Sequence, residues 1–154
     1  MIRVAVLTIA AISALPLTAQ SPAAAKTYAQ KLVDEALQKH RELLILVMHV
    51  TPPDSSENVI VASNIGRIGK KADEDDLRVI DTGRTNLEVN AKGDRFEVEL
   101  VLEDASGKNI GALGTVFAYK DGDDKAKLQK AAEKIRAELG KQIPSKDKLF
   151  DSVQ

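Results

Sequence analysis

The sequence predicts an α+β fold in which one antiparallel sheet of about five strands carries an N-terminal helix, a short middle helix and a C-terminal helix. The first observation is the order of the periodic segments, which reads helix, two strands, short helix, three strands, helix. The second is the shortness of most connections between strands, because hairpin-length connections join antiparallel neighbours. The third is residues 94–120, which have the pattern of a long β-hairpin and around which the other segments are organised.

The predicted hairpin has one apolar face and one polar face in its first strand. Apolar residues alternate there with mostly acidic ones, and a period of two places Glu97, Glu99 and Glu103 together on the face expected to meet solvent. Residues 104–109 have the short polar side chains and the glycine of a turn. The return strand, 110–119, contains Gly111 and Gly114, where a strand can bend or let another group approach closely.

The remaining elements follow from local patterns in chain order. The continuous apolar run 43–50 predicts a central strand buried on both faces. Asp73 and Gly83 are typical of the two ends of a helix, so they bound the short middle helix. The other predicted elements are a helix over 26–41, a loop over 51–57, strands over 58–63 and 86–90, and an amphipathic helix over 123–141.

Residues 1–25 have the layout of a secretory signal peptide. A positive start at Arg3 is followed by an uncharged apolar run over 4–17 and then by small residues before Lys26. The apolar run is shorter than the roughly 20 residues that a spanning helix needs, although an uncleaved anchoring helix is the alternative. We therefore predict one domain over 26–142, a polar and loosely held tail over 143–154, and a periplasmic or secreted product that is not embedded in the membrane after cleavage.

Composition excludes several classes of function. The chain has no cysteine, so neither disulfides nor thiolate chemistry are expected. Removal of the leader takes away Arg3 and no acid, which changes the net charge from −1 to −2. A near-neutral domain with mixed charges gives no sign of nucleic-acid binding.

Three stretches carry a resemblance to a known family, and the first is the leader with the N-terminal helix ahead of the first strand. Residues 72–84 (ADEDDLRVIDTGR) are similar to the helix and following turn of the Cache fold, and residues 104–114 (DASGKNIGALG) resemble its hairpin turn. The chain thus resembles the PAS/Cache group of extracellular sensor domains, as a stand-alone secreted member. The resemblance implies the fold, small-molecule binding, and a pocket between the sheet and the segment after the second strand. The sequence has no tryptophan, so the family's best-known amino-acid-binding pattern is not present.

Candidate ligand-binding residues gather at one predicted end of the sheet. His49 and Thr51 close the buried strand, and the polar residues that follow the partner strand are Ser63, Asn64, Arg67 and Lys71. An arginine in a glycine-containing turn is suited to holding a carboxylate. The alternatives are a core-edge histidine bonded to a backbone carbonyl, and a solvated basic turn balanced by the acids of 73–76. No metal site or cofactor is predicted, since the acidic runs do not follow the calcium-loop pattern.

These observations predict a secreted or periplasmic small-molecule-binding sensory domain. Its ligand would be a small anionic metabolite such as a carboxylate, and it would act with a separate membrane receptor or envelope protein. The alternative is an envelope protein-interaction module without a ligand. An enzyme would need an acid–base pair that converges in a cleft, and because no nucleophile–base arrangement is evident in the sequence, we predict that the chain is not an enzyme.

Overall fold

The computed structural model describes residues 25–153. The predicted signal peptide over 1–25 therefore lies almost entirely outside the described residues. None of the described helices is both long enough and apolar enough to cross a membrane.

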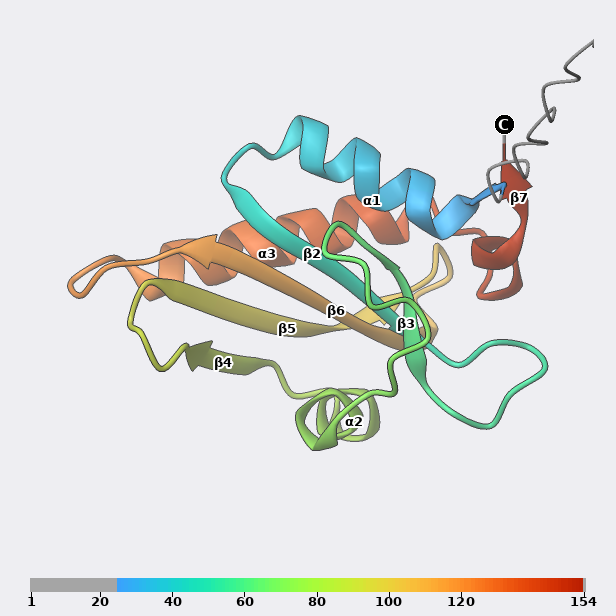
Figure 1. The fold of residues 1–154 in the computed structure, drawn as a ribbon, viewed down its shortest axis with the longest axis horizontal. Helices are drawn as coiled ribbons and strands as arrows, with labels where there is room; N and C mark the ends of the chain where they lie inside the picture. Colours follow the sequence, from blue (N-terminus) through green and yellow to red (C-terminus); the bar gives the residue numbers. More distant parts are fainter. Residues whose placement is uncertain (1–24, 154) are drawn as a thin grey trace, which may run out of the picture.

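The fold is built on one five-stranded sheet, as the sequence predicted. All neighbouring strands are antiparallel, and the spatial order is β3-β2-β6-β5-β4. The two longest strands, β5 and β6, form the predicted hairpin; β6 is the central strand, and β2 lies between β3 and β6 (Figure 1). The strands are β2 (Leu43–Val50), β3 (Val59–Ser63), β4 (Asn86–Val89), β5 (Arg95–Glu103) and β6 (Asn109–Ala118).

Two long helices cover one face of the sheet. The helices α1 (Tyr28–Lys39) and α3 (Lys125–Gly140) run across this face, and their apolar sides meet the alternate residues of the strands (Figure 1). Together they form one hydrophobic core, as expected for amphipathic helices on a sheet. Its largest fully buried side chains include Leu32, Leu46, Met48, Phe96, Leu102, Leu113, Phe117, Ile135 and Leu139.

The short helix α2 (Glu74–Thr82) packs against β5 and β6 on the opposite face. Its start is a capping box in which the Asp73 carboxylate accepts the backbone N–H of Asp76, and the Asp76 carboxylate accepts that of Asp73. Its end is Gly83, whose φ of 71° is the left-handed conformation that favours glycine. Both ends of this helix confirm the sequence prediction.

The C-terminal tail is docked, so the expectation of a loosely held tail is wrong. Ile143 and Leu149 are fully buried, and Leu149 lies in a short 3₁₀ helix, η1 (Asp147–Phe150). The strand β7 (Ser152–Val153) then pairs with β1 (Lys26–Thr27), which brings the two ends of the described chain together. The apolar residues of the tail follow no helical or strand period, so the one sign that the tail enters the core is the pair Leu149 and Phe150.

Candidate functional site

His49 lies beneath α2, in acidic surroundings. It is 7% exposed, and its Nδ1 atom is 3.3 Å from Oδ2 of Asp76. Burial lowers the pKa of His49, and this outweighs the opposing effect of the Asp76 carboxylate. The neighbour of the His49 ring is thus the Asp76 carboxylate and not the backbone carbonyl considered as an alternative. Because a second acid, Glu99, also packs here, the surroundings of His49 do not favour an anionic ligand.

Asp76 and Glu99 form a buried pair of acids beside this histidine. Glu99 is 4% exposed, which corrects the prediction that it faces solvent. Burial, together with the hydrogen bond to Asp76, raises the pKa of Glu99 to about 9, so its carboxyl group keeps a proton and donates it to Asp76. Burial acts to raise the pKa of Asp76, but the hydrogen bonds from Glu99 and the Asp73 backbone lower it. The pair therefore consists of one neutral acid and one carboxylate.

Ser63 and Asn64 have structural partners. The Asn64 side chain accepts a hydrogen bond from the Leu46 N–H (3.0 Å) and donates one to the Leu44 carbonyl (2.9 Å), so it extends the pairing of β2 beyond β3. The Ser63 hydroxyl accepts the Ile65 N–H at 2.9 Å. These bonds hold the turn that follows β3 against the sheet.

Arg67 and Lys71 lie in the segment that follows this turn. Backbone bonds of Ile60 with Gly69 and Lys70 place the segment along the outer edge of β3. Arg67 is exposed with a φ of 64°, and within residues 25–153 no hydrogen bond or ion pair joins its guanidinium to another side chain. Lys71 is paired with Glu57. The structure thus does not gather the predicted cations around His49.

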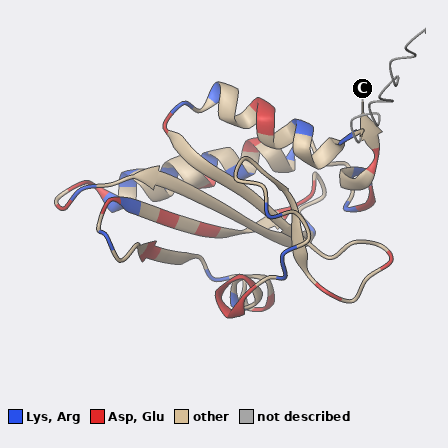
Figure 2. Cartoon of the chain, in the orientation of Figure 1, with Lys and Arg blue, Asp and Glu red and all other residues tan. Residues whose placement is uncertain are grey.

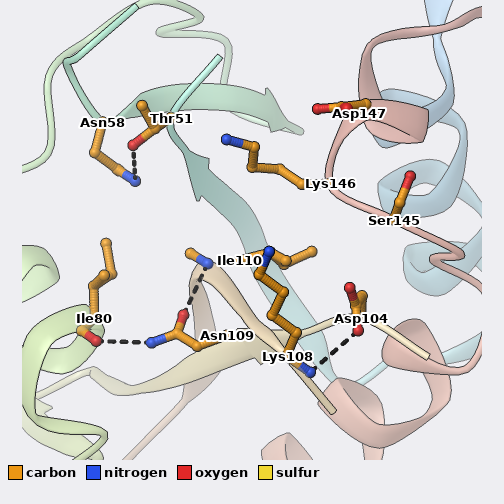
Figure 3. A pocket seen from close by; sticks show the side chains of 11 residues that line it. Thr51, Asn58, Ile80, Asp104, Lys108, Asn109, Ile110, Ser145, Lys146 and Asp147 are labelled. Atoms are coloured by element: carbon orange, nitrogen blue, oxygen red, sulfur yellow. Dashed lines mark hydrogen bonds between the residues drawn. The ribbon is translucent and has the colours of Figure 1, made fainter. Parts of the chain in front are cut away.

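An open cavity of about 580 Å³ lies instead at the end of the sheet (Figure 3). It is bounded by the end of β2, the start of β6, the last turn of α2, the β5–β6 turn and the C-terminal tail. Thr51 is the predicted ligand-binding residue that lines it. The other lining residues are Asn58, Ile80, Asp104, Lys108, Asn109, Ile110, Gly111, Ser145, Lys146 and Asp147.

Two lysines, Lys108 and Lys146, and two acids, Asp104 and Asp147, line this cavity. The side chains of Lys108, from the β5–β6 turn, and Lys146, from the tail, point into the space (Figure 3). Neither ammonium group has a carboxylate within ion-pair distance in the part of the chain that the structure describes. One of the two acids, Asp104, is already satisfied, because its Oδ1 accepts from the Ser106 hydroxyl (2.6 Å) and from the backbone N–H groups of Ser106 (2.9 Å) and Lys108 (3.1 Å). The Ser106 hydroxyl and these N–H groups lower the pKa of Asp104.

The other walls combine fixed amides with apolar side chains. The Asn109 amide donates to the Ile80 carbonyl (2.8 Å) and accepts the Gly111 N–H (3.1 Å), which ties α2 to the start of β6. Ile80 and Ile110 supply apolar surface beside the lysines. Cationic heads above apolar walls can hold a small organic anion.

Sequence reasoning missed Lys108 and Lys146 because they come from segments interpreted as a turn and a loose tail. The two apolar residues Leu149 and Phe150 were the one signal that the tail docks. Their burial brings Lys146 to the sheet.

Comparisons with known proteins identify the architecture. No protein-family model matches the sequence, and no curated protein matches it. Among solved structures, the chain is similar to the A. aeolicus nlh2 GAF domain in an inactive state, with a TM-score of 0.56 and 11% identity over 76% of this chain and 83% of that chain. It is also similar to a putative GAF sensor protein from Burkholderia vietnamiensis, with a TM-score of 0.55 and 11% identity over 78% and 76% of the two chains. The fold is GAF-like.

A third structure, the Agobacterium tumefaciens repressor BlcR, agrees, with a TM-score of 0.52 and 10% identity over 76% of this chain and 67% of that chain. The GAF-like architecture agrees with the predicted α+β fold, in which three helices cover one antiparallel sheet. The narrower resemblance to Cache domains and the location outside the cytoplasm stay predictions.

Proposed function

We propose that this chain is a sensory domain that binds a small carboxylate-bearing metabolite in the cavity at the end of the sheet. The observation that carries the proposal is the pair of lysines, Lys108 and Lys146, which enter one cavity from two separate segments without carboxylate partners of their own among the described residues. Two ammonium groups that share a partly enclosed space repel each other, and an anion between them relieves that repulsion.

The chemistry of the walls supports an organic anion rather than a simple ion. Thr51 and Asn109 offer polar groups, while Ile80 and Ile110 offer apolar contact for a carbon skeleton. The fold supports the same proposal, since a putative GAF sensor protein shares it. The ligand class predicted from the sequence is therefore kept, but its site moves from the Arg67 turn to the cavity that contains Thr51.

A thermal-shift screen of the purified protein against small mono- and dicarboxylates tests the site. A ligand that binds only the native state at about a hundredfold excess over its dissociation constant stabilises it by about 2.7 kcal/mol, a shift of several degrees. Lys108→Met and Lys146→Met should each remove most of that shift. Lys130→Met, at an exposed position of α3 outside the cavity, is the matched control and should keep it. Equal shifts in all four proteins would place the ligand elsewhere.

Export and a membrane partner are further parts of the proposal. The leader-like start of the sequence supports export, and an exported sensory domain can pass its signal on through a separate membrane receptor. Expression of the full gene followed by intact-mass measurement of the envelope fraction should give a chain that begins at Lys26. An unprocessed chain confined to the cytoplasm would contradict export and leave the cavity proposal standing.

A further inference from the structure

The face of the sheet beside α2 carries an acidic surface, which we define as Glu88 of β4, Glu97 of β5 and the first residues of α2, Asp73, Glu74 and Asp75. The strand register sets Glu88 directly opposite Glu97, and both side chains are exposed. Figure 2 shows the acids of β4, β5 and α2 on neighbouring elements. Like charges directly opposite each other on antiparallel strands are destabilising, so this arrangement has a cost for folding.

The acids of this surface are poorly neutralised by the chain itself. Asp75 forms an ion pair with Arg78 at 2.7 Å. Among residues 25–153, no basic side chain forms an ion pair with Glu88, Glu97, Asp73 or Glu74. Desolvation, and then repulsion from Glu88 and Asp76, raises the pKa of Glu97. The repulsion is therefore present in the folded protein, and a cationic partner would relieve it.

A buried side chain points into the same cluster. Glu99 is two residues from Glu97 on the same face of β5 and is 96% buried, since only 4% of its surface is exposed. The carboxyl group of Glu99 shares a proton with Asp76, so the negative charge of this buried pair lies on Asp76. After desolvation and Glu88, the Asp76 carboxylate also raises the pKa of Glu97, so this buried charge adds to the acidic surface and favours a positively charged group in front of it.

The edge of the sheet beside this surface is open. β4 is the last strand in the spatial order, and no described strand pairs with its outer side. The other edge, β3, differs, because residues 69–72 run along it and form backbone hydrogen bonds with Asn58 and Ile60. Unpaired backbone groups on an edge strand can accept an additional strand from a partner.

We propose that the acidic surface and the β4 edge together bind an extended, lysine- or arginine-rich segment of a protein partner. The charges are spread over β4, β5 and α2, which suits several cationic side chains of one segment better than a single small cation. No group of three ligating side chains suited to a metal ion occurs among the described residues. The partner's backbone extends the sheet along Asn86–Val89, and its cationic side chains lie beside Glu88 and Glu97. This surface is distinct from the carboxylate cavity and does not depend on the function proposed for it.

Binding of a fluorescent octalysine peptide, measured by anisotropy at low ionic strength, tests the surface. Loss of two charge contacts of about 0.7 kcal/mol each predicts that the double variant Glu88→Gln/Glu97→Gln binds about tenfold more weakly. The charge-matched control Asp54→Asn/Asp121→Asn alters two exposed acids elsewhere and should bind as the wild type does. Equal weakening in the two double variants, or no binding by the wild type, would overturn the proposal.

Two further probes decide the kind of occupant. An octalysine with alternate backbone nitrogens methylated has the same charge but cannot pair as a strand, so it should bind more weakly than the unmodified peptide. Equal affinity of the two peptides would overturn the proposed addition of a strand to β4. Tighter binding of spermine than of octalysine would overturn the proposal, because the surface would then bind a small polyamine and not a peptide segment. Self-association of the wild type that the Glu88→Gln/Glu97→Gln variant loses would make a second copy the occupant and would also overturn the proposal.

Discussion

The two faces of the sheet are built on different physical principles. Under α1 and α3 the contacts are apolar, with side chains such as Leu113 and Phe117 fully or almost fully removed from solvent. Under α2 the sheet buries His49, Asp76 and Glu99, so the contact depends on which of these groups holds a proton. The apolar face supplies stability that is independent of pH, whereas the α2 face makes stability and the position of α2 sensitive to protonation.

The two binding regions that we propose differ in the charged groups they offer to a ligand. The cavity presents Lys108 and Lys146, whereas the surface beside α2 presents Glu88 and Glu97. Separate signs allow an anionic ligand and a cationic partner to bind the same small domain at different places. Because Asn109 bonds the Ile80 carbonyl, α2 borders both regions.

The largest effect is expected on the apolar face. Leu113 is fully buried, and Leu113→Ala should lower the free energy of unfolding by about 2–5 kcal/mol, since it leaves a cavity in the core. Leu77→Ala removes the same atoms from an exposed position of α2 (43% exposed) and should change it by less than about 0.5 kcal/mol. Urea unfolding measures both, and similar losses would contradict the assignment of the core to the α1 and α3 face.

The next effect is on the α2 face and depends on pH. The pKa of Glu99 is raised from 4.5 to about 9, so its contribution to stability is fully present below about pH 4.5 and is lost as the pH rises toward 9. Glu99→Gln keeps a neutral side chain at every pH and should be more stable than the wild type by about 1–3 kcal/mol at pH 8. The difference should vanish near pH 4.5. A gain that does not change with pH would contradict a shared proton.

A smaller loss is expected at the start of α2. Asp73→Ala removes the cap and should lower the free energy of unfolding by about 1 kcal/mol. Asp73→Asn keeps a side-chain oxygen that can accept the Asp76 N–H, so it should lower the free energy of unfolding much less. Comparison of the two variants by thermal unfolding separates the cap from the charge, and equal losses would indicate that the charge matters more.

The smallest effect concerns His49. Because burial lowers its pKa below 6.5, the unfolded chain takes up a proton first, and stability falls as the pH drops below 6.5. His49→Gln should remove part of this fall, by about 0.5–1 kcal/mol near pH 5. Unfolding curves at several pH values check this. An unchanged slope in the variant would show that other groups account for the acid sensitivity.

Local patterns predicted most of the fold because the residues that specify each element lie close together in the sequence. Alternation identified β5, the apolar run identified β2, and the cap residues Asp73 and Gly83 identified both ends of α2. The burial of Glu99 could not be predicted, because α2 covers that end of β5 only through tertiary packing. Glu97 lies two residues before Glu99 on the same face of β5 and is exposed.

The candidate site was less predictable than the fold. Thr51 was correctly placed at the end of a strand, but the cavity around it is completed by Lys108 and Lys146, which lie far away in sequence. Arg67 and Lys71 are close to Thr51 in sequence, yet backbone bonds carry their segment along the outer edge of β3. Sequence proximity thus indicated Arg67 and Lys71, whereas the docking of the tail decides which cations reach the cavity.

A titration followed by amide NMR tests the central claim most directly. The purified protein would be titrated with the carboxylate that gives the largest thermal shift, and the backbone amide signals followed residue by residue. We predict saturable shifts at Thr51, Lys108–Gly111 and Ser145–Asp147, and unchanged signals at 65–70. Shifts centred on 65–70 and His49, with the cavity residues unaffected, would contradict the account and return the site to the Arg67 turn.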